Sequence, residues 1–229
     1  MSTETKNYFS GNYSHYLGAD FFQKAMIESS KKVEKRKKYF QEDFARYFNV
    51  ELINQNIVDP DVLPFLEKHD ITEDPEYSQI NVQRRLDLHS YYLERGAFPD
   101  DRRVYVAYAS PELGFGVFAN VYIPAWTIVA EYTGVITRKH VNTDYAWVYH
   151  SAPLDANGEK MKLHIDGRFK GNVGRFVNHS ETPNCEVVRV PYQNRWRVLY
   201  VSNKAILPDE ELTVSYGTNY WSVRNKVSH

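Results

Sequence analysis

The feature that most constrains the fold is a change of pattern near residue 100. From Arg103 onward the chain consists of short runs rich in β-branched and aromatic residues, such as "RVYVAYA", "TIVAEYTGVI", "WRVLYVS" and "LTVSYG". Gly, Pro, Asn and Asp separate these runs, as is typical of short strands joined by turns. We therefore predict a mostly β domain of small twisted sheets over residues 99–217.

The first 98 residues have a helical pattern instead. Four aromatic residues are spaced as on one face of an amphipathic helix: Phe40, Phe44, Tyr47 and Phe48. A short helix is expected in "DPDVLPFLEKHD", beginning at Asp59 or Asp61. A longer helix begins at Asp74-Pro75. Val82, Leu86 and Leu93 form its apolar side, and Gly96 is expected to end it. The predicted fold class is α+β, with a helical N-terminal region (1–98), the β domain and a short C-terminal segment (218–229).

Composition limits the classes of function. The 229 residues carry a formal net charge of −1, so nucleic-acid binding would need a local basic patch. The single cysteine, Cys185, cannot build a disulfide or a cysteine-rich zinc site, and the histidines show no metal-ligand spacing, so we expect no metal. No apolar run of about 18 residues is present, and the N-terminus lacks an apolar core. We therefore predict no membrane span and no Sec-type signal.

The basic run "KKVEKRKK", residues 31–38, has two interpretations. It is either the solvated face of a helix or a nuclear-localisation or nucleic-acid patch. The sequence leaves direct nucleic-acid binding open, and also the formation of a homodimer.

Four stretches of the β half carry small or hydrogen-bonding residues in an unusual density. They are "GFGVFA" (114–119), "EYTGVI" (131–136), "GNVGRFVNHSETPNC" (171–185) and "DEELTVSYGTNYW" (209–221). Two glycines around one aromatic residue let the backbone approach a ligand closely. Alone, each stretch is weak, because a G-x-G is usually a turn and a strand tyrosine is usually packing.

In this order and spacing the four stretches resemble the SET-domain protein lysine methyltransferases, over about residues 103–221. The linking segments are most similar to the small SET proteins of chlamydia-like intracellular bacteria. The resemblance implies S-adenosyl-L-methionine as methyl donor and a histone or histone-like basic protein as substrate. It also implies the bacterial cytoplasm, or secretion without a Sec signal into a host cell and its nucleus. Many family members flank this core with zinc-binding cysteines, which are absent here, so "GTNYWSVRNK" is the candidate lid.

The resemblance also assigns roles to residues. Tyr216 matches the catalytic tyrosine and Tyr132 a tyrosine lining the lysine channel, while Trp147 and Val214 are expected in the substrate channel. The cofactor-binding residues it implies are Gly114, Phe115, Gly116, Tyr145, Asn178, His179, Tyr220 and Trp221. It further implies that the C-terminal segment threads a loop containing "NHS", where small hydrogen-bonding groups satisfy crossing backbones.

Three alternatives stay open at this point. His179 could be a general base and Cys185 a nucleophile, although neither has the neighbours that such roles need. The whole domain could be a catalytically degenerate SET fold that binds chromatin or basic protein tails.

Val214, two residues before Tyr216, is small and has no hydroxyl, which by resemblance predicts di- or trimethyllysine as product unless a tyrosine reaches the pocket from elsewhere.

Overall fold

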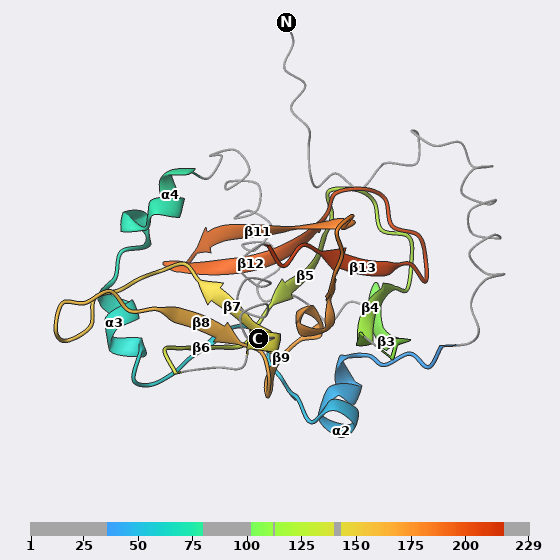
Figure 1. Ribbon diagram of the computed structural model, residues 1–229, viewed down its shortest axis with the longest axis horizontal. Helices are drawn as coiled ribbons and strands as arrows, with labels where there is room; N and C mark the ends of the chain where they lie inside the picture. Colours follow the sequence, from blue (N-terminus) through green and yellow to red (C-terminus); the bar gives the residue numbers. More distant parts are fainter. Residues whose placement is uncertain (1–35, 80–101, 112, 140–142, 218–229) are drawn as a thin grey trace, which may run out of the picture.

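The computed structural model describes residues 36–79, 102–111, 113–139 and 143–217 (Figure 1). The N-terminal elements are η1 (Gln41–Asp43), α2 (Phe44–Phe48), β1 (Glu51–Leu52), β2 (Ile57–Val58), α3 (Leu63–Lys68), η2 (Ile71–Glu73) and α4 (Pro75–Gln79). Then follow β3 (Val104–Ser110), β4 (Gly114–Ala119), β5 (Ile128–Tyr132), β6 (Val135–Thr137), η3 (Thr143–Tyr145), β7 (Ala146–Tyr149) and β8 (Leu163–Asp166). The last are β9 (Lys170–Gly171), η4 (Val173–Phe176), β10 (Asn178–His179), β11 (Cys185–Tyr192), β12 (Arg195–Ser202) and β13 (Glu211–Val214).

The described strands form four small sheets rather than one large one. Their strand orders are β1-β9, β10-β13-β4-β3, β11-β12-β5 and β2-β6-β8-β7. Figure 1 shows β11, β12 and β5 above β7, β8 and β6, with β3 and β4 to one side. Every residue of β5 is buried. This arrangement is the predicted mostly β architecture.

The first predicted helix begins later than its aromatic spacing indicates. Tyr39 makes an antiparallel bridge with Val106, and Phe40 is still extended. The Phe40 N–H donates to the Asp43 carboxylate at 3.0 Å, and this contact closes the 3-10 turn that precedes α2. Asn49, at φ 52°, then ends α2, because asparagine tolerates the left-handed conformation. The prediction of one aromatic face from Phe40 to Phe48 was therefore wrong in extent.

Two short strands of the N-terminal region were missed. β1 pairs in parallel with β9, and β2 pairs in parallel with β6. The segment from β1 to β2 is therefore built into the sheets of the second half. The boundary at residue 98 stays a prediction.

The other two predicted helices begin close to their expected positions. The Asp59 carbonyl accepts the N–H groups of Val62 and Leu63, and α3 follows that turn. Helix α4 begins at Pro75 as predicted. Val82, Leu86, Leu93 and Gly96, which complete that prediction, lie outside the described residues.

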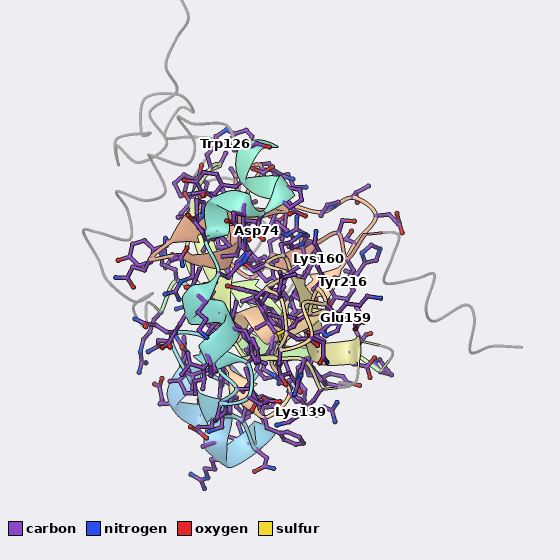
Figure 2. The ribbon with its side chains drawn as sticks, turned by 90° about the vertical axis from the view of Figure 1, so that its left-hand side faces the viewer. Asp74, Trp126, Lys139, Glu159, Lys160 and Tyr216 are labelled. Atoms are coloured by element: carbon purple, nitrogen blue, oxygen red, sulfur yellow. The ribbon has the colours of Figure 1, made fainter. Side chains whose placement is uncertain are left out.

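Asp74, just before α4, joins the N-terminal region to the β domain. Its carboxylate accepts hydrogen bonds from Ser151 Oγ at 2.7 Å and Trp196 Nε1 at 2.8 Å, and it pairs with His69 Nε2 at 2.8 Å. Figure 2 shows Asp74 beside α4, whereas Figure 1 shows α3 and α4 at one edge of the molecule and α2 below β3 and β4. The described helices therefore lie at two separate places around the sheets. No helix among the described residues is long and apolar enough to cross a membrane.

The described end of the basic run lies against aromatic rings. Arg36 lies over Phe118 with its guanidinium 4.2 Å from the ring centroid. Lys38 lies 4.2 Å from the ring of Tyr105, and its Nζ also contacts Asp209 at 3.4 Å. Residues 36–38 are therefore packed against the β3-β4 hairpin rather than arranged as one face of a helix.

The crossing predicted around "NHS" is made by β10 and β13. These strands pair in parallel, with Asn178 opposite Thr213 and His179 opposite Val214. The Asn184 side chain holds β13 twice, since its Nδ2 donates to the Glu211 carbonyl at 2.8 Å and its Oδ1 accepts from the Thr213 N–H at 2.9 Å. As predicted, an asparagine amide satisfies backbone groups where two segments cross.

Candidate active site

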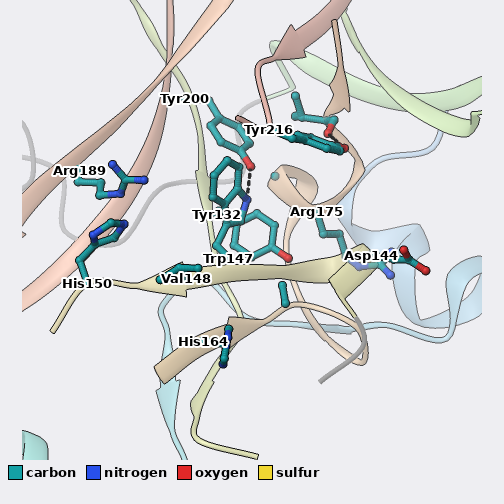
Figure 3. A pocket seen from close by; sticks show the side chains of 13 residues that line it. Tyr132, Asp144, Trp147, Val148, His150, His164, Arg175, Arg189, Tyr200 and Tyr216 are labelled. Carbon is teal, nitrogen blue, oxygen red and sulfur yellow. Dashed lines mark hydrogen bonds between the residues drawn. The ribbon is translucent and has the colours of Figure 1, made fainter. Parts of the chain in front are cut away.

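A cavity of about 320 Å³ lies between the sheets (Figure 3). Three tyrosines from separate strands or strand ends line it: Tyr132 at the end of β5, Tyr200 on β12 and Tyr216 after β13. Trp147 on β7 lies among them, with ring centroids 6.1 Å from Tyr132, 6.3 Å from Tyr200 and 6.3 Å from Tyr216. The centre of the cavity is therefore aromatic and carries three hydroxyl groups.

Tyr216 is held from two directions. Its hydroxyl donates to the Val177 carbonyl at 2.8 Å, and its backbone N–H donates to His179 Nδ1 at 3.2 Å. Because the hydroxyl proton is directed to a carbonyl, the oxygen can offer only lone pairs to a group in the cavity. The strand crossing thus fixes the orientation of the predicted catalytic tyrosine.

Tyr132 is arranged in the same way. Its hydroxyl donates to the Tyr145 carbonyl, and its side chain is buried. A Cβ at residue 167 would lie 2.7 Å from this hydroxyl, so the site needs Gly167. Burial raises the pKa of Tyr132 above its ordinary value, so this phenol stays protonated at neutral pH.

Tyr200 is one of the cavity residues that the sequence did not predict. Its oxygen accepts a hydrogen bond from Trp147 Nε1 at 2.9 Å, which leaves its own proton without an acceptor in the described part of the chain. Burial, together with the neighbouring Tyr132 and Tyr216, raises its pKa. β12 pairs with β5 so that Val198 is opposite Tyr132, which puts Tyr200 and Tyr132 on one face with centroids 6.5 Å apart. The alternation along "WRVLYVS" indicates which residues share a face of this strand, but not which other strand pairs with it.

The residues predicted to bind the cofactor gather on another part of the domain, at β4 and β10. Asn178 Nδ2 donates to the Phe115 carbonyl at 3.2 Å and to Glu211 Oε1 at 2.8 Å. A Cβ at Gly116 would lie 2.4 Å from Glu211 Oε1, so a larger residue there would displace the Glu211 side chain that Asn178 contacts. Gly114, at φ +71°, has open space beside it. The Phe115 ring, by contrast, packs on Phe48 with centroids 4.9 Å apart.

The remaining predicted residues divide into three groups. Trp147 lines the cavity as expected. Two do not line it: the Tyr145 ring lies 4.2 Å from the guanidinium of Arg175, and Val214 is fully buried. Tyr220 and Trp221 lie outside the described residues. Arg175 donates to the Gly167 carbonyl at 2.7 Å and also lines the cavity.

The two alternative chemical roles receive no support from the geometry. His179 Nδ1 accepts the Tyr216 N–H, and Nε2 contacts Glu181 at 3.0 Å, so neither nitrogen faces the cavity as a base. Burial raises the pKa of Cys185 to about 12, which keeps its thiol protonated and unreactive. Within residues 36–79, 102–111, 113–139 and 143–217 there is no cluster of three or more His, Cys, Asp or Glu side chains suited to a metal ion.

Comparison with known proteins gives the same picture of the fold. Residues 114–217 match the family model described as the SET domain. The histone-lysine N-methyltransferase EHMT1 of Mus musculus is 32% identical over 127 residues, which are 52% of this chain and 10% of that protein. The H3 lysine-36 specific histone-lysine N-methyltransferase of Cryptococcus neoformans is 33% identical over 113 residues, 46% of this chain and 13% of that protein. The chain thus spans about a tenth of the length of these relatives.

A solved structure agrees over more of the chain. The crystal structure of ATXR5 in complex with histone H3.1 superposes with a TM-score of 0.58 and 21% sequence identity, covering 78% of this chain and 86% of that one. That likeness shows the fold. Together with the family match, it shows that residues 114–217 of this chain have the fold of a SET domain.

Proposed function

We propose that this protein is a protein lysine N-methyltransferase that uses S-adenosyl-L-methionine. The observation that carries the proposal is the cavity in which Tyr132 and Tyr216 point hydroxyl oxygens inward while their protons bind carbonyls. Such oxygens accept N–H groups and so orient an amine. The relatives that match the SET domain are named histone-lysine N-methyltransferases, which supports the same activity.

The cavity suits an amine that must lose its proton. Lysine has a pKa of about 10.4 in water, and removal from water lowers it because the charged form is disfavoured. The rings of Tyr132, Trp147, Tyr200 and Tyr216 supply that dry environment. The same aromatic walls attract a methylated, cationic product. None of these steps needs a nucleophilic side chain of the protein, because the lysine amine is the nucleophile and its positioning supplies most of the catalysis.

The residues around β4 and β10 fit the cofactor. β10 is the edge strand of its sheet, so one side of its backbone faces no described strand and can bind an adenine edge. Gly114, with open space beside it, leaves room for close approach of a ligand to the backbone. When bound, S-adenosyl-L-methionine supplies an electrophilic methyl group. Asn178, His179 and the glycines would hold it, and Tyr216 would then lie between the cofactor and the cavity.

The substrate we propose is a histone or histone-like basic protein. ATXR5, the structural neighbour described above, is in complex with histone H3.1, and the curated relatives are named for histone lysines. The affinity with small SET proteins of chlamydia-like bacteria, and the cytoplasmic or secreted localisation that goes with it, remain proposals. So do binding of nucleic acid and formation of a homodimer.

For the product we propose dimethyl- or trimethyllysine. Val214 is fully buried and outside the cavity lining, so it does not narrow the space around the amine. Tyr200 is the residue that would restrict it, because its hydroxyl proton can hold a water molecule in the position of a further methyl group.

Two observations argue against the alternative, a degenerate SET fold that only binds basic tails. The hydroxyls of Tyr132 and Tyr216 are both oriented by carbonyls, which binding alone does not require. At the described end of the basic run, Arg36 and Lys38 are exposed but lie over the rings of Phe118 and Tyr105, which already hold these two cations.

Transfer of a labelled methyl group from S-adenosyl-L-methionine to a mixed histone preparation tests the proposed activity. We expect the label in methyllysine after complete hydrolysis of the histones. Binding of the cofactor and of histones with no label in lysine would instead identify a binding module.

A further inference from the structure

The cavity has two chemically different ends. One is the aromatic centre around Tyr132, Tyr200 and Tyr216. At the other end, which Figure 3 shows beyond Val148, lie Arg189 from β11 and His150 just after β7. The proposed methyl transfer uses only the aromatic centre, so the function of the Arg189–His150 end is unexplained.

Arg189 is a half-buried cation without a partner in the described ranges. Its Nε is enclosed and makes no hydrogen bond there, and no described carboxylate forms a salt bridge with it. Burial lowers its pKa, which the charge of Glu76 only partly offsets. A guanidinium whose Nε is removed from water and left without an acceptor is unfavourable, so this position fits an anion brought by a ligand.

His150 adds a second group of the same kind. Its Nδ1 lies 2.7 Å from Glu76 Oε1, and since a carboxylate only accepts, Nδ1 carries a proton. Its Nε2 is enclosed and has no hydrogen-bond partner among the described residues. A carboxylate placed here would accept from Arg189, and also from His150 Nε2 when both ring nitrogens carry protons. Glu76 is hydrogen-bonded to His150 and not to Arg189, so it does not fill that place.

The position of this end favours the protein substrate over the cofactor as the source of the carboxylate. None of the predicted cofactor residues at β4 and β10, namely Gly114, Phe115, Gly116, Asn178 and His179, lines the cavity. The end is instead continuous with the aromatic centre in which the target lysine would lie. A residue near that lysine in the substrate sequence can therefore reach it.

We propose that Arg189 and His150 form a subsite that binds an acidic side chain of the protein substrate, Asp or Glu, near the target lysine. The subsite rests on the proposed methyltransferase activity for the position of the lysine. It makes the protein select lysines by a neighbouring carboxylate and not by basic sequence alone.

An array of peptides tests the subsite. Each peptide has one central lysine, and a single glutamate, or glutamine as its neutral match, is placed in turn at each of the five positions on either side. Both retention of the protein and transfer of labelled methyl groups are measured on every spot. We expect glutamate to be preferred over glutamine by about tenfold at one position. Arg189→Gln abolishes that preference, and Arg189→Glu reverses it toward lysine at the same position. Arg138→Gln, which alters an exposed arginine paired with Asp61, is the matched control and leaves it unchanged.

The outcomes separate the subsite from the activity. Glutamate-dependent, Arg189-dependent retention without methyl transfer supports the subsite and overturns the methyltransferase proposal. Transfer with no glutamate preference, or with a preference that survives in Arg189→Gln, overturns the subsite alone. A loss of cofactor affinity in Arg189→Gln, measured by calorimetry, assigns the arginine to the cofactor and also overturns it. A lower melting temperature of Arg189→Gln with unchanged peptide preference means that Arg189 pairs within the chain, which overturns the subsite. If no spot retains the protein and no spot is methylated, both proposals are overturned.

Discussion

Two regions hold Tyr216, and they use different chemistry. The cavity orients its tyrosines through hydroxyl groups on the backbone carbonyls of Val177 and Tyr145. The strand crossing fixes β13 through the amide of Asn184 and the pairing with β10. The first arrangement leaves hydroxyl lone pairs that can act on a substrate, whereas the second leaves its amide groups satisfied by backbone. We infer that function is concentrated in the cavity and stability in the crossing.

The largest effect on function is expected from Tyr216→Phe, which changes the cavity and leaves the strand crossing intact. The ring stays packed on Trp147, but the amine loses the oxygen that orients it, so turnover falls by about a hundredfold. Cofactor affinity stays close to that of the unmodified protein. Initial rates on histones and calorimetric titration with S-adenosyl-L-methionine measure the two quantities. The matched control is Tyr47→Phe, an exposed tyrosine on α2. Turnover that survives in the Tyr216 variant would break the contrast.

Asparagine substitutions in the crossing should mainly change stability. Asn184→Ala removes the two hydrogen bonds to β13 and leaves buried backbone groups unsatisfied, which lowers the free energy of unfolding by about 1–3 kcal/mol. Asn178→Ala should lower it as well and also weaken cofactor binding, because this residue lies beside the glycine pair. Denaturant unfolding and calorimetry compare the variants. Equal cofactor affinity in both variants would remove Asn178 from the cofactor site.

Alkaline pH should affect the cavity through its buried phenols. The pKa values of Tyr132 and Tyr200 are raised in the folded protein, so each stays neutral where the unfolded chain ionises. Their contribution to folding stability is fully present below a pH of about 10, the ordinary pKa of tyrosine, and is lost as pH rises above it. Denaturant unfolding between pH 8 and pH 11, carried out in parallel on Tyr200→Phe, measures the slope of the free energy of unfolding against pH. A slope unchanged in that variant would show that Tyr200 ionises as freely as in the unfolded chain.

The smallest expected effect is that of Tyr200→Phe on the product. The variant loses the hydroxyl that Trp147 Nε1 contacts, so the cavity gains little volume but loses a site for a water molecule. We expect mass spectrometry after exhaustive reaction to show at least as many methyl groups as with the unmodified protein. If the unmodified protein stops at one methyl group, Val214 does not determine the product and Tyr200→Phe should release the block.

The sequence predicted the elements whose pattern is local. The strand runs after Arg103 and the start of α4 at Pro75 were found because residue type and turn chemistry determine them. β1 and β2 were missed because strands of two residues have no measurable alternation, and they form only by pairing with β9 and β6. The start of α2 was misplaced because the bridge between Tyr39 and Val106 keeps the chain extended there.

The candidate site divides in the same way. Tyr132, Trp147 and Tyr216 were found through resemblance to a family. Tyr200 was not, since its place depends on how β12 pairs with β5. Arg189 was missed for a related reason: an arginine in a strand is ordinary in sequence, and only its burial without a described partner distinguishes it.

The most direct test of the central claim is a crystal structure of the protein with the demethylated cofactor and a monomethyllysine peptide. We predict that the lysine nitrogen lies in the aromatic centre, within hydrogen-bond distance of the Tyr216 or Tyr132 hydroxyl, with the cofactor beside Asn178 and Gly116. A lysine bound outside this cavity, or a cofactor bound away from β4 and β10, would contradict it.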